Sequence, residues 1–278
     1  MVLRNRTARR RENMLWRLVE WVCIALALAL IVSIANRLVS RRAIRNEEQA
    51  SSVRIETARA VDDGLPTADE IEEHAEQFDS LLTQNADFQG WVLFGDSRSL
   101  YVCRGEDNAY YMTHRFDGRE DAAGMVFMDF QCTWESQNVL LYGHNMKDGS
   151  RFGTLNRYEK PEYLLSHPWI SVQTEDGLRA YRPVAVFYAS TDPTNSAYFD
   201  FEQPNFGDKT DYRAYVASAQ ERSIYDTGTD VRDGESLLTL VTCSSEVDSG
   251  RLVILCRAQR RGESYIVQTE ESIDEAKA

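Results

Sequence analysis

Residues 239–257 read TLVTCSSEVDSGRLVILCR: two apolar runs joined by a polar loop, a pattern that predicts two strands and their connection. Cys243 ends the first run and Arg251 begins the second, so pairing of the two strands would bring the thiol and the guanidinium close together. Three interpretations of Cys243 follow. It is a nucleophile with a cationic helper, half of a disulfide bond, or a small buried residue.

Short β-like runs of the same kind, broken by turns, fill the chain from Phe88 onward. So many strands at this spacing predict an antiparallel barrel or sandwich rather than a parallel α/β sheet. No internal repeat or linker divides the region, so we interpret it as one domain. The runs are GWVLF (90–94), SLYVC (99–103), GMVFMDF (124–130), NVLLYGH (138–144), WISVQT (169–174), RAYRPVAVFYAS (179–190), SLLTLVTC (236–243), RLVILCRA (251–258) and SYIVQT (264–269).

Helices are expected at three places around these strands. A capping box that begins at Thr67, followed by apolar residues at helical spacing, predicts a helix just before the first strand. Residues 154–168 and 208–223 have the composition of helical insertions. The sequence therefore predicts a mainly β domain with a few helices attached to it.

The N-terminus carries a segment suited to a membrane. Residues 21–35 are apolar apart from Ser33, and with a short backward extension the run approaches the roughly 20 residues that cross a bilayer. Arginines on its N-terminal side favour a cytoplasmic N-terminus. A cleaved signal peptide ending at Ser33-Ile34-Ala35 is the alternative, and both interpretations export the body of the chain. The expected organisation is a cytoplasmic basic tail (1–14), a transmembrane signal-anchor (15–36), a stalk (37–66) and an extracellular domain (67–278).

The charge distribution argues against one class of partner. Residues 1–45 hold ten arginines and two glutamates, whereas the rest of the chain holds 21 basic and 42 acidic residues. Nucleic-acid binding needs a cationic surface, so no nucleic-acid partner is expected for the exported body. Export also permits disulfides, and the pairs Cys103–Cys132 or Cys243–Cys256 would suit that compartment. A body of this size does not need them to form a core.

Two predicted strand ends carry the residue types that nucleophilic catalysis needs. A cysteine nucleophile requires a thiolate and a nearby acid or base, usually histidine. His144 ends a predicted strand as Cys243 does, whereas His114 and His167 lie among turn-like residues. Arg251 offers a fixed cation to an oxyanion or a substrate carbonyl, and a solvated arginine at a strand edge is the alternative.

Metal and cofactor motifs are missing from the sequence. It contains no CxxC, HExxH, GxGxxG, Walker-type loop or GxSxG elbow. Acidic residues are so frequent that no carboxylate pair stands out, and Asp148 is only an available candidate for a carboxylate beside His144. We therefore expect no metal and no organic cofactor.

Several motifs in a fixed order resemble one known family. TLVTC (239–243) is followed eight residues later by Arg251, and YGHNMKDGSRF (142–152) lies upstream. GWVLF, EDNAYYMTHRFDG and AGMVFMDF precede them. Together they are similar to the class B sortases, cysteine transpeptidases of Gram-positive cell surfaces, from about Phe88 to the VILCRA strand. The resemblance implies a closed sortase-type β-barrel with an N-terminal helix and helical insertions, preceded by one transmembrane helix.

The resemblance also implies roles for individual residues. Cys243 would be the nucleophile, His144 the general acid/base, and Arg251 the group that stabilises the oxyanion or orients the substrate. The implied substrate-binding residues are Thr242, Asn108 and Ser244. Val241 and Ser244 stand where the family commonly has a serine and an acidic residue, so the sorting motif of this protein is expected to differ from the best-known ones.

The implied activity is cleavage of a C-terminal sorting signal after threonine, through a cysteine thioester, and transfer to an amine. Expected partners are surface proteins with LPxTG- or NPxTN-like signals, and an acceptor amine on lipid II or peptidoglycan, or a pilin lysine. The enzyme would lie in the cell membrane with a single span and its catalytic domain outside. Two alternatives stay open: a cysteine peptidase or amidase that transfers to water, and a non-catalytic surface domain stapled by disulfides.

Overall fold

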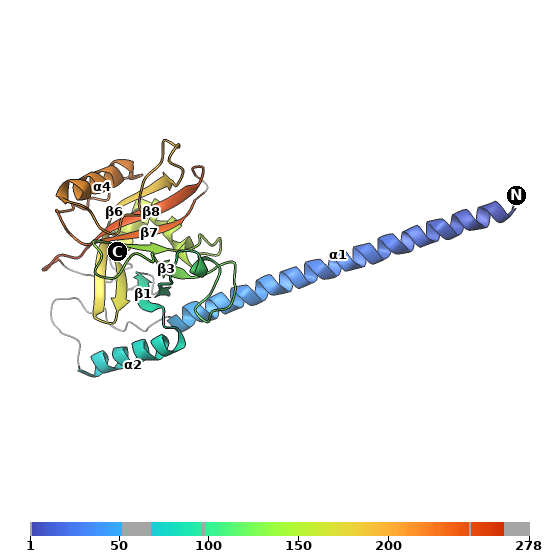
Figure 1. Cartoon of the computed structure of the whole chain (residues 1–278), viewed down its shortest axis with the longest axis horizontal. Helices are drawn as coiled ribbons and strands as arrows, with labels where there is room; N and C mark the ends of the chain where they lie inside the picture. The colour runs from blue at the N-terminus through green and yellow to red at the C-terminus, as the bar shows by residue number, and fades with distance from the viewer. Residues whose placement is uncertain (1, 52–67, 96–97, 245, 264–278) are drawn as a thin grey trace, which may run out of the picture. The chain divides into compact units, whose positions relative to one another are not determined.

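Eight strands close into a barrel in the part of the chain that the structure describes, as the sequence predicted (Figure 1). The computed structural model describes residues 2–51, 68–95, 98–244 and 246–263. The ninth predicted run, residues 264–269, lies outside them. The strands are β1 (Phe88–Phe94), β2 (Arg98–Cys103), β3 (Val126–Met128), β4 (Asn138–Tyr142), β5 (Ile170–Thr174), β6 (Gly177–Ser190), β7 (Leu237–Cys243) and β8 (Gly250–Ala258).

The barrel mixes antiparallel and parallel pairs. Its strand order is β1-β2-β3-β4-β7-β8-β6-β5, and β5 pairs with β1 to close it. Most pairs are antiparallel, but β2 with β3 and β4 with β7 are parallel. The expectation of an antiparallel barrel was wrong for these two pairs, because the spacing of the runs does not show which strands become neighbours. Parallel neighbours need a crossover of a dozen or more residues, and the chain between β4 and β7 supplies it with β5, β6 and the helical insertions.

Strand β1 shows how the core is built from two apolar clusters. Val92 and Phe94 belong to the larger cluster, which includes buried residues of every strand, whereas Trp91 and Leu93 belong to a smaller one that also contains Phe88. Phe88 and Trp91 face the same side because a bulge between Phe88 and Gly90 shifts the alternation by one residue. Each large apolar side chain buried in this way contributes about 1.5–3 kcal/mol relative to exposure.

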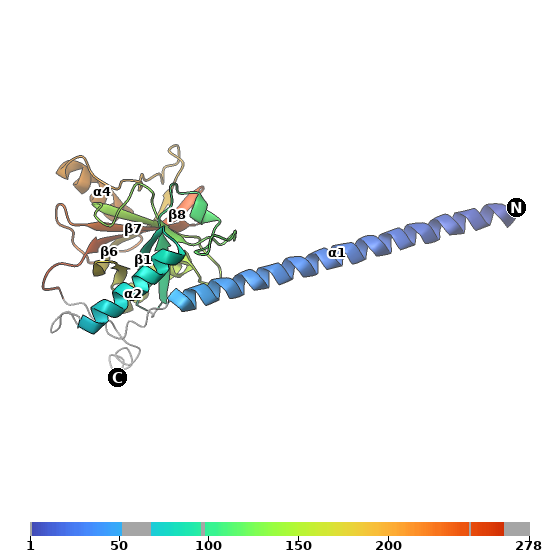
Figure 2. The same cartoon turned by 60° about the horizontal axis from the view of Figure 1, so that its bottom comes forward.

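All three places where the sequence predicted helices are helical in the structure. Helix α2 (Ala68–Gln84) packs against β1 through Phe78, whose ring lies 5.0 Å from that of Phe88 (Figure 2). Thr67 of the predicted capping box lies outside the described residues. The first insertion forms a 3₁₀ helix η2 (Phe152–Glu159) and α3 (Pro161–Ser166), and a short 3₁₀ turn η1 spans Tyr110–Met112. The second insertion is α4 (Lys209–Arg222), which packs on β6 and is capped by the Asp208 carboxylate.

Helix α1 spans Val2–Ser51 as one continuous helix, and its residues as far as Glu47 belong to a separate compact unit. Within it, Glu20–Asn46 is long and apolar enough to cross a membrane, with a mean hydropathy of 2.3 over its most apolar window. A signal sequence near an N-terminus has the same properties. The helix continues through the end of the predicted span into the first part of the predicted stalk.

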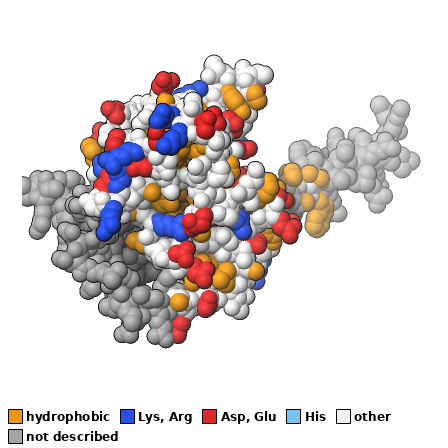
Figure 3. All heavy atoms as spheres, turned by 60° about the vertical axis from the view of Figure 1, so that its left-hand side comes forward, with side chains coloured by type: hydrophobic (Ala, Val, Ile, Leu, Met, Phe, Trp, Pro, Cys, Tyr) orange, Lys and Arg blue, Asp and Glu red, His pale blue; other side chains and the backbone are white. Residues whose placement is uncertain are grey.

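Charges of both signs cover the face of the molecule drawn in Figure 3. Acidic and basic side chains are interspersed there with polar and apolar ones. Mixed signs are typical of a solvated protein surface. The acidity of the body is therefore not gathered into a single-sign patch on this face.

Candidate active site

The parallel pairing of β4 and β7 brings His144 and Cys243 together. Tyr142 pairs with Val241 at the end of this ladder. His144 and Cys243 each follow two residues later, so the two side chains extend from the same level of neighbouring strands. Pairing with β8 adds the third residue, because Cys243 lies directly opposite Arg251 in the antiparallel register. Directly opposed residues project from the same face of a sheet.

The backbone carbonyl of Met112 holds the His144 ring. His144 Nε2 lies 2.8 Å from this oxygen, which only accepts hydrogen bonds, so Nε2 carries the hydrogen. Nδ1 is then the ring nitrogen left for the thiol. The hydrogen bond with Cys243 raises the pKa of His144, supported by the Met112 contact and opposed by burial.

The thiol of Cys243 is half-buried, and the charged groups around it favour its ionised form. Its hydrogen bond with His144 lowers the pKa of Cys243, and the charge of Arg251 adds to this effect against the opposing effect of burial. The two shifts favour the same state, a thiolate beside an imidazolium. A thiolate is the form of cysteine that acts as a nucleophile.

A cleft of about 230 Å³ opens beside these residues. Arg251 lies in its wall, and one of its N–H groups donates to the carbonyl oxygen of Gly250 at 2.9 Å. Glu202 also lines the cleft, where burial and the neighbouring carboxylates of Asp129 and Asp200 raise its pKa. The lining residues are Asn108, Met112, Phe127, Tyr142, Gly143, Thr191, Phe201, Glu202, Val241, Thr242, Cys243 and Arg251.

Two of the three predicted substrate-binding residues line this cleft. Asn108 is half-buried, and its amide donates to the buried carboxylate of Asp129 at 2.8 Å and accepts from the Phe130 N–H at 3.0 Å. Thr242 lines the cleft too, but its side chain is buried and its hydroxyl donates to the Gly143 carbonyl at 2.8 Å. Ser244 lies one residue beyond β7, where its N–H donates to the Gly250 carbonyl at 3.0 Å. Whether these three bind substrate stays a prediction.

The other residues considered as catalytic candidates, His114, His167 and Asp148, make contacts of their own. His114 stacks on Tyr110 and His167 on Tyr163, with ring centroids 4.0 and 4.1 Å apart. Asp148 accepts hydrogen bonds from the main chain and hydroxyl of Ser150 within its own turn. The partner of His144 Nε2 is instead the Met112 carbonyl, which no side-chain pattern in the sequence can indicate because every residue has this group.

Two further polar contacts at the site were missed by sequence reasoning. The Asn145 side chain donates to the carbonyl oxygen of Cys243 at 2.8 Å. The hydroxyl of Tyr142 donates to Asp129 at 3.0 Å, beside the Asn108 contact. Asn145 adjoins His144 in the YGHN motif, so proximity to a catalytic candidate was the only signal available for it.

Cysteine pairing and metal binding find no support in the described residues. All five cysteines are free, and Cys256 is fully buried within strand β8. Cys132 donates to the Asn138 carbonyl, with sulfur and oxygen 3.6 Å apart. No group of three or more His, Cys, Asp or Glu side chains within the described ranges is arranged to hold a metal ion.

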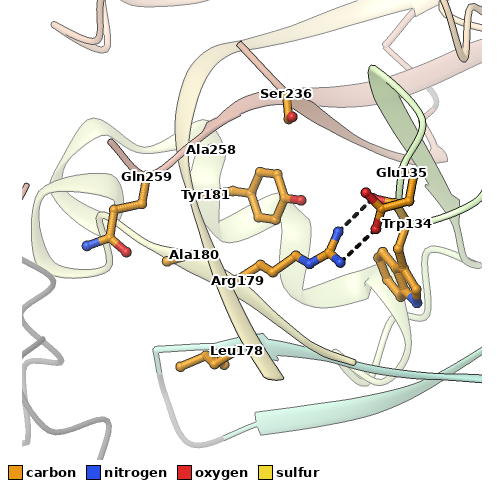
Figure 4. Close-up of a pocket in the computed structure, with 9 residues that line it drawn as sticks. All are labelled: Trp134, Glu135, Leu178, Arg179, Ala180, Tyr181, Ser236, Ala258 and Gln259. Carbon is orange, nitrogen blue, oxygen red and sulfur yellow. Dashed lines mark hydrogen bonds and ion pairs between the residues drawn. The ribbon is translucent and has the colours of Figure 1, made fainter. Parts of the chain in front are cut away.

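A second cleft, of about 300 Å³, contains none of the predicted site residues (Figure 4). Its basic group is Arg179, which donates to the Trp134 carbonyl at 2.7 Å and pairs with Glu135 of the same cleft at 2.9 Å (Figure 4). Asp176 is a second carboxylate partner at 3.3 Å. The guanidinium charge is thus already neutralised by the protein, which indicates a structural ion-pair network.

Comparison with known proteins gives one consistent result. The chain is 34% identical to Sortase B of Listeria monocytogenes over 179 residues, which cover 63% of this chain and 70% of that protein. The structure of Bacillus anthracis sortase B in complex with AAEK1 is 25% identical, with a TM-score of 0.64 over 81% of this chain and 100% of that one. A Staphylococcus aureus sortase B–substrate complex shares the fold, with a TM-score of 0.62 at 23% identity, over 69% of this chain and 90% of that one. No protein-family model matches the chain.

Proposed function

Because the chain belongs to the sortase B family of cysteine transpeptidases, we propose that it cleaves a C-terminal sorting signal and joins the protein that carries it to an amine. Cys243 is the nucleophile of this proposal, His144 the general acid/base and Arg251 the oxyanion donor. The observation that carries it is the strand register that brings Cys243 beside both His144 and Arg251, where their mutual interaction lowers the pKa of the thiol and raises that of the imidazole.

The first half of the reaction forms a thioester. The Cys243 thiolate attacks the carbonyl carbon of the signal's threonine, and the carbonyl oxygen becomes an oxyanion. Arg251 lies opposite Cys243 and has five N–H donors, of which one is used on Gly250, so its guanidinium can stabilise this charge. The C–N bond then breaks, and the His144 imidazolium gives its proton to the departing amine.

The second half regenerates the enzyme. A neutral His144 removes a proton from the acceptor amine, whose nitrogen attacks the thioester carbonyl. The C–S bond breaks as the new amide forms, and the thiolate–imidazolium pair returns. No redox change occurs in either half, and the residues of this chain supply every proton transfer.

The N-terminal segment fits an enzyme whose substrates are held at a membrane. In the proposed organisation, residues 1–14 are cytoplasmic, residues 15–36 span the cell membrane, residues 37–66 form a stalk and residues 67–278 form the extracellular catalytic domain. Confinement to the same surface raises the effective concentration of enzyme and substrates. The long apolar helix supports this arrangement by its length and composition.

The proposed substrates are surface proteins with an LPxTG- or NPxTN-like sorting signal, and the proposed acceptor is an amine of lipid II, peptidoglycan or a pilin. The related Staphylococcus aureus enzyme has been solved as a substrate complex, which supports a substrate in the equivalent cleft. Val241 and Cys243 both line the cleft here, so one of the two residues that differ from the family pattern shares the cleft wall with the nucleophile.

A thioester trap tests the proposal. The full chain in detergent is incubated with a library of pentapeptide sorting signals, and its intact mass is measured. We expect a mass increase equal to the acyl fragment, located on Cys243 by peptide mapping and absent from the Cys243→Ala variant. Addition of an amine with a productive peptide should yield the amide. Release of free acid alone would support the peptidase alternative, and an unmodified protein with every peptide would contradict the proposal.

A further inference from the structure

The hydrogen-bond ladder between β4 and β7 changes from a main-chain donor to a side-chain donor beside Cys243. The N–H of Gly143 donates to the Val241 carbonyl at 3.2 Å, as a parallel ladder requires. Continued by two residues, the ladder would next join the N–H of Asn145 to the Cys243 carbonyl. That carbonyl instead accepts from the side chain of Asn145, with Nδ2 and oxygen 2.8 Å apart. A side-chain amide thus takes the place of its own residue's main-chain donor.

A second asparagine fixes the orientation of this amide. Asn145 Nδ2 donates to Asn156 Oδ1 at 3.1 Å, and Asn156 Nδ2 donates back to Asn145 Oδ1 at 2.8 Å. The Cys243 carbonyl accepts the other Nδ2 hydrogen of Asn145, because a carbonyl can only accept. Reversal of the Asn145 amide would set oxygen against oxygen at the Cys243 contact. The pair is therefore held in one orientation by three hydrogen bonds.

The side-chain link leaves room between the two strand ends. A carboxamide on a Cβ reaches farther than a main-chain N–H, so the chain after Gly143 can diverge from β7 while staying bonded to it. His144 lies on this diverging segment, between Gly143 and Asn145, and its ring interacts with the thiol. Just before the divergence, the Thr242 hydroxyl donates to the Gly143 carbonyl at 2.8 Å, so the two segments stay connected there as well.

We propose that Asn145 is a positioning residue that sets the separation of His144 and Cys243 by holding the carbonyl of the nucleophile itself. The inference rests on the proposed function and deepens it, because it concerns how the same site is held. Geometry of this kind matters to rate, since a displacement of about 1 Å costs up to about 100-fold. Asn145 does not itself line the cleft, and it contacts Cys243 through the main-chain carbonyl, so its effect acts through Cys243.

Two isosteric variants separate the loss of the Asn145–Cys243 hydrogen bond, called the tether below, from the effect of an added negative charge. Asn145→Asp replaces the donor to the Cys243 carbonyl with an acceptor, whereas Asn156→Asp leaves the Asn145 donor in place. Both add one negative charge to the same pair. The Asn145→Ala variant removes the tether together with the hydrogen bonds to Asn156 and adds no charge. The primary readout is the pH dependence of Cys243 alkylation by iodoacetamide, followed by peptide mass spectrometry on the full chain without any substrate.

We expect the alkylation inflection to move to higher pH in Asn145→Asp and Asn145→Ala, and to stay near the wild-type position in Asn156→Asp. With a productive peptide, kcat should fall roughly 10–100-fold in Asn145→Ala while KM changes little. Unchanged inflections in both Asn145 variants overturn the inference. So do equal shifts in both Asp variants, and so does loss of cooperative melting in Asn145→Ala, because a positioning residue is not needed for folding.

The alkylation readout also separates this inference from the proposed function. Iodoacetamide reacts with the thiolate whether or not a sorting signal exists. Failure of every peptide to form a thioester would remove the transpeptidase proposal and leave the alkylation result standing. A wild-type alkylation profile in the Asn145 variants would remove the positioning role and leave transpeptidation intact.

Discussion

Cys243 and Arg251 occupy directly opposed positions of the β7–β8 pair, so the guanidinium and the thiol project from the same face of the barrel. Their register is fixed by the strands on which they lie, which are buried along most of their length. A one-residue slip would turn every side chain of one strand to the other face. The same packing that stabilises the barrel therefore also fixes the charge beside the nucleophile.

Removal of the Cys243 sulfur should abolish transfer without unfolding the protein. Cys243 is half-buried at a strand end, so Cys243→Ala loses little packing. We expect no detectable product and a melting temperature near that of the wild type. Cys256→Ser is the matched control, because it leaves a hydroxyl in a fully buried position and should cost about 1–3 kcal/mol of unfolding free energy while Cys243 stays reactive. Residual transfer by Cys243→Ala would remove this residue from the mechanism.

The pH dependence of alkylation should report the Cys243–His144 pair. The hydrogen bond from His144 lowers the pKa of the thiol, so the wild-type inflection should lie below the ordinary cysteine value of about 8.5. Protonated His144 stabilises the thiolate, and its own raised pKa extends this state upward in pH. In His144→Ala the inflection should therefore rise toward or above the ordinary value. His114→Ala, which alters a histidine stacked on Tyr110, serves as the control and should leave the inflection in place.

Replacement of Arg251 by lysine should separate charge from geometry. Lysine keeps one positive charge but lacks the planar fork of N–H donors. We expect kcat/KM to fall roughly 100-fold, as for loss of one oxyanion donor, with a small change in melting temperature. Arg182→Lys, on β6 beside Trp169, should leave the rate unchanged. An Arg251→Lys variant with the wild-type rate would exclude Arg251 as an oxyanion donor.

The sequence predicts most of the fold because its signals are local. Strand runs and helical insertions follow from short-range patterning, and Cys243 and Arg251 belong to two strands joined by a short loop. The contact of His144 with Cys243 is different, since it depends on the parallel pairing of β4 with β7 across a long crossover. Residue types alone left that contact open, and the family resemblance supplied it.

The contacts that hold the site were harder to predict than the residues that would react. The Met112 carbonyl fixes the His144 ring, yet a main-chain oxygen leaves no trace in residue identity. The Asn145 contact arises only where one strand ladder ends, a boundary that the strand runs do not show. Both contacts follow from backbone geometry, which becomes visible only once the barrel is closed.

Substitutions of Thr242 distinguish a role in substrate binding from a role in linking two strands. The resemblance implies that it binds substrate, whereas its buried hydroxyl donates to the Gly143 carbonyl and so links the strand of Cys243 to the residue before His144. Thr242→Val has nearly the same shape but no hydroxyl, which leaves that carbonyl without this donor and should cost about 1–2 kcal/mol of unfolding free energy. Thr242→Ser keeps the hydroxyl and should retain most of the stability. If the side chain serves as a link, kcat falls with the melting temperature in the valine variant while KM for the peptide holds. A rise in KM with unchanged stability would instead assign the hydroxyl to the substrate.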